Sequence, residues 1–111
     1  MRNSTKSLIA LAFQMRDSIP EHMRKKYPVQ CFPLFSLILA VGNPRVDFLS
    51  LDIEGAELAV LNTIPWDKVV IELVMVEVMH SDRQEIDKIM EKAGYAVWRN
   101  LNNQDIIYRK R

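Results

Sequence analysis

The pattern of hydrophobic positions changes at about residue 28. From there on, short runs dense in apolar and β-branched residues alternate with segments whose apolar residues recur every three or four positions. The first pattern is typical of strands and the second of amphipathic helices. The expected strands are Val29–Phe32, Val46–Leu51, Val69–Val78, Tyr95–Leu101 and Asp105–Tyr108, and the expected helices are Leu34–Val41, Ala56–Ile64 and Ser81–Gly94.

Local signals support several of these boundaries. Pro33 suits the first position of a helix, where its missing N–H costs nothing. The run 42–44, Gly-Asn-Pro, is typical of a helix end. Ser81 with Gln84 three positions later predicts a capping box, and the pair Asn102-Asn103 predicts the turn of a hairpin.

Two segments carry a prediction about burial. Val69–Val78 is dense in β-branched residues, as expected for a strand buried on both faces of a parallel sheet. A helix is the alternative there, but Glu72 and Glu77 do not share one helical face. The helix after Ser81 should pack on the sheet through an apolar stripe and keep Asp87 and Glu91 in water. That stripe consists of Ile86, Ile89, Met90 and Ala93.

The alternation of strands and helices predicts an α/β fold. Its sheet should be mostly parallel with right-handed crossovers, and the C-terminal hairpin should add one antiparallel strand. Residues 29–111 form this domain. Residues 1–28 are a basic segment, with one amphipathic helix expected at 7–18 and a linker between Pro20 and Pro28. A solvated helix is the interpretation we favour over a transit peptide or a membrane-surface helix.

Composition narrows the classes of function. The chain has 111 residues, a net charge of +1 and a single cysteine, so a disulfide framework and a thiolate metal cluster are excluded. The tryptophans are not interleaved with a basic stripe, which argues against a nucleic-acid partner. No apolar run reaches the 20 or so residues of a membrane span. With three glycines, the chain also lacks the glycine-rich phosphate-binding motifs.

Acidic residues follow two of the expected strands. Asp52 and Glu54 come after the strand at 46–51, and Glu77 ends the strand at 69–78, with His80 beyond it. Ligands bind past the carboxyl ends of strands in open α/β sheets. If the two strands are parallel neighbours, these four residues converge on one rim. Carboxylates sharing a crevice raise one another's pKa, which suits a general base or a metal site.

Structural roles are the alternative for these acids. Glu54 and Glu57 stand where a helix dipole favours negative charge, and Asp52 is placed to cap the helix that follows. We take Asp52, Glu54 and Glu77 as the candidate catalytic residues. No residue is assigned to cofactor or metal binding. His22, in the basic segment, is not a candidate.

The run Val46–Val78 resembles the FkbM methyltransferase family. In that family a strand ends in D-x-E-G-x-E, a helix carries E-x-x-V-L, and the next strand ends in V-E. Here these are residues 52–57, 57–61 and 76–77. Residues 31–40 and the C-terminal hairpin are similar to an arthropod-type branch that includes Star-like proteins. The resemblance covers residues 28–110.

The resemblance implies a Rossmann-like fold of class I methyltransferases, with strand order 3-2-1-4-5-7-6 and S-adenosylmethionine as the methyl donor for an unknown acceptor. The strands of this chain match the fourth to seventh. The family's glycine loop after strand one and acid after strand two have no counterpart before Val29. The chain is therefore expected to be a fragment that binds no donor and is inactive alone. The alternative is a non-catalytic Star-like protein in membrane-protein trafficking, on the secretory route rather than in the cytoplasm.

The same comparison predicts an unpaired edge. In the family's order, the strand at 46–51 lies beside strand one, which is missing here. A bare apolar edge of this kind is a template for pairing with another chain. We therefore expect self-association through this edge.

Overall fold

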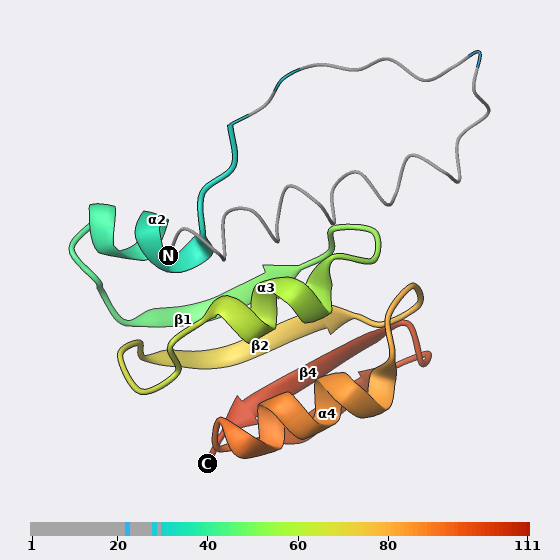
Figure 1. Cartoon of the computed structure of the whole chain (residues 1–111). Coiled ribbons are helices and arrows are strands. Elements are labelled where there is room, and N and C mark those ends of the chain that lie inside the picture. Colours follow the sequence, from blue (N-terminus) through green and yellow to red (C-terminus); the bar gives the residue numbers. More distant parts are fainter. Residues whose placement is uncertain (1–21, 23–27, 29) are drawn as a thin grey trace.

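The structure, a computed structural model, describes residues 22, 28 and 30–111 (Figure 1). The helix expected at 7–18 lies outside the described residues. The described elements follow one another as three helices and four strands. They are α2 (Leu34–Ala40), β1 (Val46–Leu51), α3 (Glu57–Thr63), β2 (Ile71–Glu77), α4 (Arg83–Lys92), β3 (Tyr95–Leu101) and β4 (Asp105–Lys110).

The four strands form one sheet in the order β1-β2-β4-β3. β1 and β2 are parallel, with Leu51 opposite Val76, whereas β4 is antiparallel to both β2 and β3. The α/β class is confirmed. The expectation of a mostly parallel sheet is wrong for the described residues, because the hairpin contributes two of the three strand pairs. The strand order β1-β2-β4-β3 corresponds to 4-5-7-6, the last four positions of the order 3-2-1-4-5-7-6 that the family resemblance implies.

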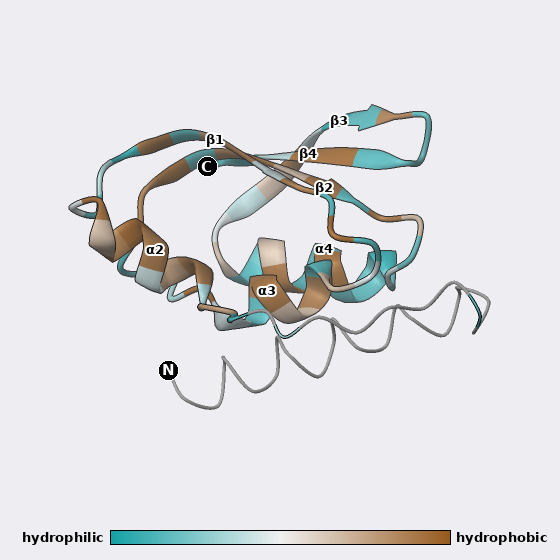
Figure 2. Cartoon of the chain, turned by 90° about the horizontal axis from the view of Figure 1, so that it is seen from above, coloured by the Kyte–Doolittle hydropathy of each residue, from teal (hydrophilic) through white to brown (hydrophobic). Residues whose placement is uncertain are grey.

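All three described helices lie against one face of the sheet (Figure 2). The core is formed between them and the inward side chains of the strands, among which Val74, Val76 and Ile106 are fully buried. On β1, Leu49 and Leu51 contact this core, and because side chains alternate along a strand, those of Phe48 and Ser50 face the other way. Phe48 accordingly lies on the opposite face and is exposed.

Several element boundaries differ from the expectation. No strand forms at residues 30–32, and Val29 lies outside the described residues. Pro33 is the N-cap of α2 rather than its first residue. The N-cap of α4 is Asp82, whose carboxylate accepts hydrogen bonds from the backbone N–H groups of Gln84 and Glu85. The prediction that Ser81 is the N-cap is therefore wrong. Its hydroxyl donates a hydrogen bond to Glu57 instead.

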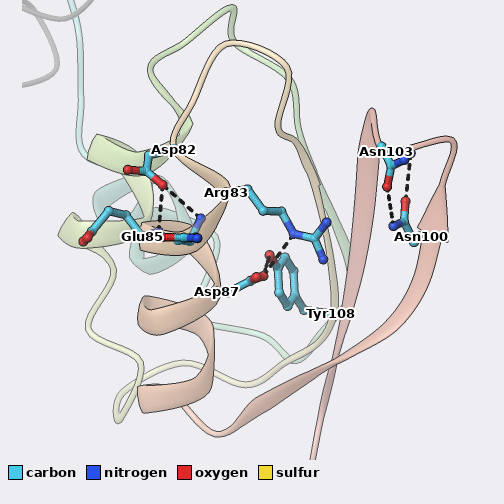
Figure 3. A network of polar contacts seen from close by, with 8 residues as sticks. Asp82, Arg83, Glu85, Asp87, Asn100, Asn103 and Tyr108 are labelled. Atoms are coloured by element: carbon cyan, nitrogen blue, oxygen red, sulfur yellow. Dashed lines mark hydrogen bonds and ion pairs between the residues drawn. The ribbon is translucent and has the colours of Figure 1, made fainter.

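The outer face of α4 is not wholly solvated (Figure 3). Ile86 and Met90 are fully buried and Ile89 and Ala93 contact the core, as expected. Asp87, however, accepts a hydrogen bond from the hydroxyl of Tyr108 on β4. It also forms an ion pair with Arg83 at 3.3 Å. Glu91 is exposed, as predicted. The Asp87 side chain is 40% exposed, so its prediction as a residue that stays in water is only partly correct, because Tyr108 reaches it from the sheet.

The hairpin turn is confirmed at Asn102 and Asn103, which both have positive φ angles, 56° and 57°. Asparagine tolerates this conformation better than most residues do, and the turn continues through Gln104 to Asp105, where β4 begins. Within the part of the chain that the structure describes, no helix has the length and apolar character needed to cross a bilayer.

Candidate active site

The candidate site lies at the carboxyl ends of β1 and β2. Because these strands are parallel neighbours and Leu51 pairs with Val76, the next residues of the two strands, Asp52 and Glu77, come to the same edge of the sheet. The turn after Asp52 then leads into α3, whose first residue is Glu57. One carboxylate oxygen from each of Asp52, Glu57 and Glu77 lies within 4.8 Å of the others. We call these three residues the acid triad.

Glu57 holds the turn together. The residue has no exposed surface. Its Oε2 accepts the backbone N–H of Ile53 at 2.6 Å, and its Oε1 accepts the backbone N–H of Gly55 at 2.9 Å. Oε1 also accepts the hydroxyl of Ser81 at 2.9 Å. These three donors stabilise the charged carboxylate in a buried position, and Ser81 ties the turn after β1 to the segment after β2.

The turn between Asp52 and Glu57 has an unusual backbone. Glu54 and Gly55 both have positive φ angles, 55° and 106°. A left-handed conformation is unfavourable for a residue with a side chain. The hydrogen bonds that the N–H groups of Ile53 and Gly55 donate to Glu57 offset this cost. The side chain of Glu54 is exposed and pairs with Nε2 of His80 at 3.4 Å.

Glu77 is the least satisfied member of the triad. It is only 8% exposed. Its Oε1 accepts the backbone N–H of Met79 at 2.7 Å, whereas its Oε2 is buried and has no hydrogen-bond partner among the described residues. Burial raises the pKa of the Glu77 carboxyl above its usual range, the Met79 N–H opposes this, and the nearby Glu57 carboxylate raises it further. His80 lowers this pKa, and Asp52 raises it by a smaller amount.

The arrangement therefore concentrates negative charge at one rim. Among the described residues, no lysine or arginine forms an ion pair with a triad member. A buried oxygen without a donor, next to two other carboxylates, can accept a hydrogen bond or a proton from a bound molecule, or bind a cation. Asp52 is exposed and opens the triad to solvent.

The four residues expected on this rim divide into two groups. Asp52 and Glu77 meet, as predicted, but Glu54 and His80 form a separate pair beside them. Asp52 does not cap α3, since the N-cap of that helix is Ala56 and it has no side-chain cap. Glu57 was not among the candidate catalytic residues, because the helix dipole is sufficient to explain an acid at that position. The signal that pointed to it was the third acid of D-x-E-G-x-E.

The glycines among the described residues do not form a cofactor-binding loop. A glycine loop that cradles a cofactor brings glycine backbones close to the ligand. Gly42 and Gly94 each follow a helix with a φ near 92°, and a Cβ added to either would meet nothing within 4 Å. Gly55 belongs to the turn held by Glu57. These glycines shape turns and do not cradle a ligand.

Comparison with known proteins gives one match. The family model described as the methyltransferase FkbM domain matches residues 4–97, which is most of the chain. The match begins well before residue 28, where the resemblance seen in the sequence started. No curated protein and no solved structure matches the chain significantly.

Proposed function

Because the chain belongs to the FkbM methyltransferase domain family, we propose that it forms the acceptor side of an S-adenosylmethionine-dependent methyltransferase domain. In this proposal the rim at the ends of β1 and β2 binds the molecule to be methylated. Residues outside this chain bind the methyl donor. The chain alone is then inactive.

The acid triad is the observation that carries the proposal. Its members follow β1, end β2 and begin α3, yet one oxygen of each lies within 4.8 Å of the others. Maintaining a buried carboxylate oxygen without a partner is unfavourable for folding, and strained or unsatisfied groups of this kind concentrate at functional sites. An acceptor hydroxyl or amine could donate to Oε2 of Glu77, while the exposed Asp52 would contact the outer part of the same molecule.

Two observations support the division between acceptor and donor. The four described strands have the order expected for strands four to seven. In addition, residues 1–41 contain no glycine, so they do not carry the glycine loop that the family uses after its first strand. Glu54 and His80 would complete the acceptor side as an exposed charged pair next to the triad.

A chimera tests this function. Residues 1–29 would be replaced by the first three strands and intervening helices of an FkbM-domain methyltransferase whose acceptor is known. We expect the chimera to bind S-adenosylmethionine and to transfer its methyl group in a radiometric assay. Asp52→Asn should then lower kcat strongly and leave the dissociation constant of S-adenosylmethionine unchanged, because Asp52 would contact only the acceptor.

Asp67→Asn provides the matched control. Asp67 is an exposed acid that precedes β2, so it lies at the opposite end of the strands from the triad. Its replacement should leave both kcat and donor affinity unchanged. Equal kcat values for the chimera and its Asp52→Asn variant would show that the rim does not serve the acceptor. A loss of donor affinity in that variant would place the donor, rather than the acceptor, at this edge.

A further inference from the structure

We propose that the acid triad is a binding site for one divalent cation of the Mg²⁺, Mn²⁺ or Ca²⁺ type. The sequence pattern assigned no metal ligand to these residues. This site would bind its ion whether or not the chain takes part in methyl transfer.

The three ligand positions are fixed by the fold. Glu77 ends β2, Asp52 directly follows β1, and Glu57 begins α3. A cation bound by carboxylate oxygens at about 2.1–2.5 Å requires those oxygens to lie within about 5 Å of one another. One oxygen of each triad member satisfies this limit, since all three lie within 4.8 Å.

Glu77 supplies the observation that points to a ligand. Its side chain is more than nine-tenths buried, and Oε2 has no hydrogen-bond partner among the described residues. Most buried polar atoms in native proteins have a partner, so an orphaned carboxylate oxygen requires an explanation. A cation between Glu77 and the two neighbouring carboxylates would satisfy Oε2 and neutralise the charge that the three residues share.

Glu57 is held in place for such a role. Its Oε1 already accepts two hydrogen bonds, from Gly55 and Ser81, whereas Oε2 accepts only one, from Ile53. Oε2 therefore keeps a lone pair that can face a cation. Hydrogen bonds that orient a ligand from behind are a general feature of metal sites. Asp52, the exposed member, leaves an open side through which water or a substrate oxygen can complete the coordination.

The chemistry of the donors determines the class of metal. All three ligands are carboxylates, and no histidine or cysteine belongs to the triad. Hard oxygen ligands favour Mg²⁺, Mn²⁺ and Ca²⁺ over Zn²⁺ or Cu²⁺. His80, the nearest imidazole in sequence, is paired with Glu54 instead.

Titration of the full chain, residues 1–111, with MnCl2 tests the inference. Free Mn²⁺ gives an electron paramagnetic resonance signal that is lost on binding, so the signal counts bound ions directly. We expect one Mn²⁺ per chain, displaced by Mg²⁺ or Ca²⁺, and an increase in Tm that grows with ion concentration. Asp52→Asn should weaken the affinity at least about tenfold, because it removes one of three charged ligands.

Glu54→Gln is the matched control, because Glu54 is a neighbouring exposed acid outside the triad. It should change the Mn²⁺ affinity less than about threefold, as expected for the loss of a nearby but non-ligating charge. No Mn²⁺ binding at millimolar concentrations would overturn the inference. An equal loss of affinity in Asp52→Asn and Glu54→Gln would also overturn it, since that result indicates diffuse attraction to an acidic surface. Both variants change exposed side chains, so both should fold.

Discussion

Neutralising Glu77 should make the protein more stable. In wild type, the Glu77 carboxylate is buried beside two other acids, and only Oε1 receives a hydrogen bond. In Glu77→Gln the amide oxygen can keep the bond from Met79, and the amide NH2 can donate to the neighbouring carboxylates. The substitution removes a buried charge and fills an unsatisfied position without changing the size of the side chain.

The magnitude follows from the distances in the triad. Two unit charges 4.8 Å apart repel by about 3.5 kcal/mol at an effective dielectric constant of about 20. Solvent screening at the exposed Asp52 reduces the repulsion between Asp52 and Glu77. The hydrogen-bond donors around Glu57 offset part of the repulsion between Glu57 and Glu77. We therefore expect Glu77→Gln to raise the free energy of unfolding by about 1–3 kcal/mol at neutral pH, without added metal.

The stability difference between Glu77→Gln and wild type should depend on pH. The folded-state pKa of Glu77 lies above the ordinary value of 4.5, so in the interval above that value the folded chain binds more protons than the unfolded chain. Wild-type stability should then fall as the pH rises from about 4.5 through the folded-state pKa. Glu77→Gln lacks this loss. Its advantage should be near zero at about pH 4 and grow toward neutral pH.

Urea denaturation followed by circular dichroism, in buffer with a chelator, measures both quantities. Glu72→Gln is the control: it lies on the same strand, and its side chain is 37% exposed and paired with Arg45 at 3.3 Å. It should change stability by less than about 0.5 kcal/mol, as is usual for exposed ion pairs. A destabilised Glu77→Gln, or an advantage that does not vary with pH, would refute the reasoning.

Three further predictions concern the rest of the fold. Ile86→Ala should cost about 3–4 kcal/mol in urea denaturation because Ile86 is fully buried, whereas Glu91→Ala should cost less than about 0.5 kcal/mol; equal costs would mean that the faces of α4 are misassigned. Burial raises the pKa of Tyr95 to about 12, so stability should fall as the pH rises from about 10 to 12 while the unfolded phenol alone ionises; in a Tyr27→Phe variant, whose other tyrosine, Tyr108, also has a raised pKa, phenolate absorbance of the folded chain at about pH 10 would contradict this. Light scattering should show self-association, because β1 has β2 as its sole neighbour in the described sheet, and Asp47→Pro should reduce it by removing an N–H from the open edge; a monomeric wild type at tens of micromolar would disprove it.

The choice of Asp47 follows from the register of β1. The N–H of Val46 donates to the carbonyl of Val70 at 2.8 Å, toward β2. Successive N–H groups along a strand point to opposite sides, so that of Asp47 points toward the open edge. A proline at Val46 would instead break a bond within the sheet.

Much of the fold could be predicted from the sequence because its signals are local. The β-branched run around Val74 indicated a strand, and the stripe containing Ile86 indicated a helix and its buried face. The errors arose where distant residues compete for the same group. Ser81 looks like a helix cap in the sequence, but its hydroxyl donates to Glu57, 24 positions away. Asp87 looks solvated until Tyr108, 21 positions away, reaches it.

The candidate site was predictable to the same extent. Parallel pairing of two consecutive strands suffices to bring Asp52 and Glu77 to one edge, and the sequence indicates that pairing. Glu54 instead pairs with His80, in a turn whose positive φ angles the sequence pattern does not reveal. The importance of Glu57 depends on three donors that only the folded turn provides. Neither feature has a signal in hydrophobic periodicity.

Calorimetric titration of the purified chain with S-adenosylmethionine and S-adenosylhomocysteine is the most direct test of the central claim, that this chain provides the acceptor side of a methyltransferase domain and not the donor site. We predict binding no tighter than millimolar for both compounds. A dissociation constant in the low micromolar range for either compound would contradict the claim, because it would show that the donor site lies within these 111 residues.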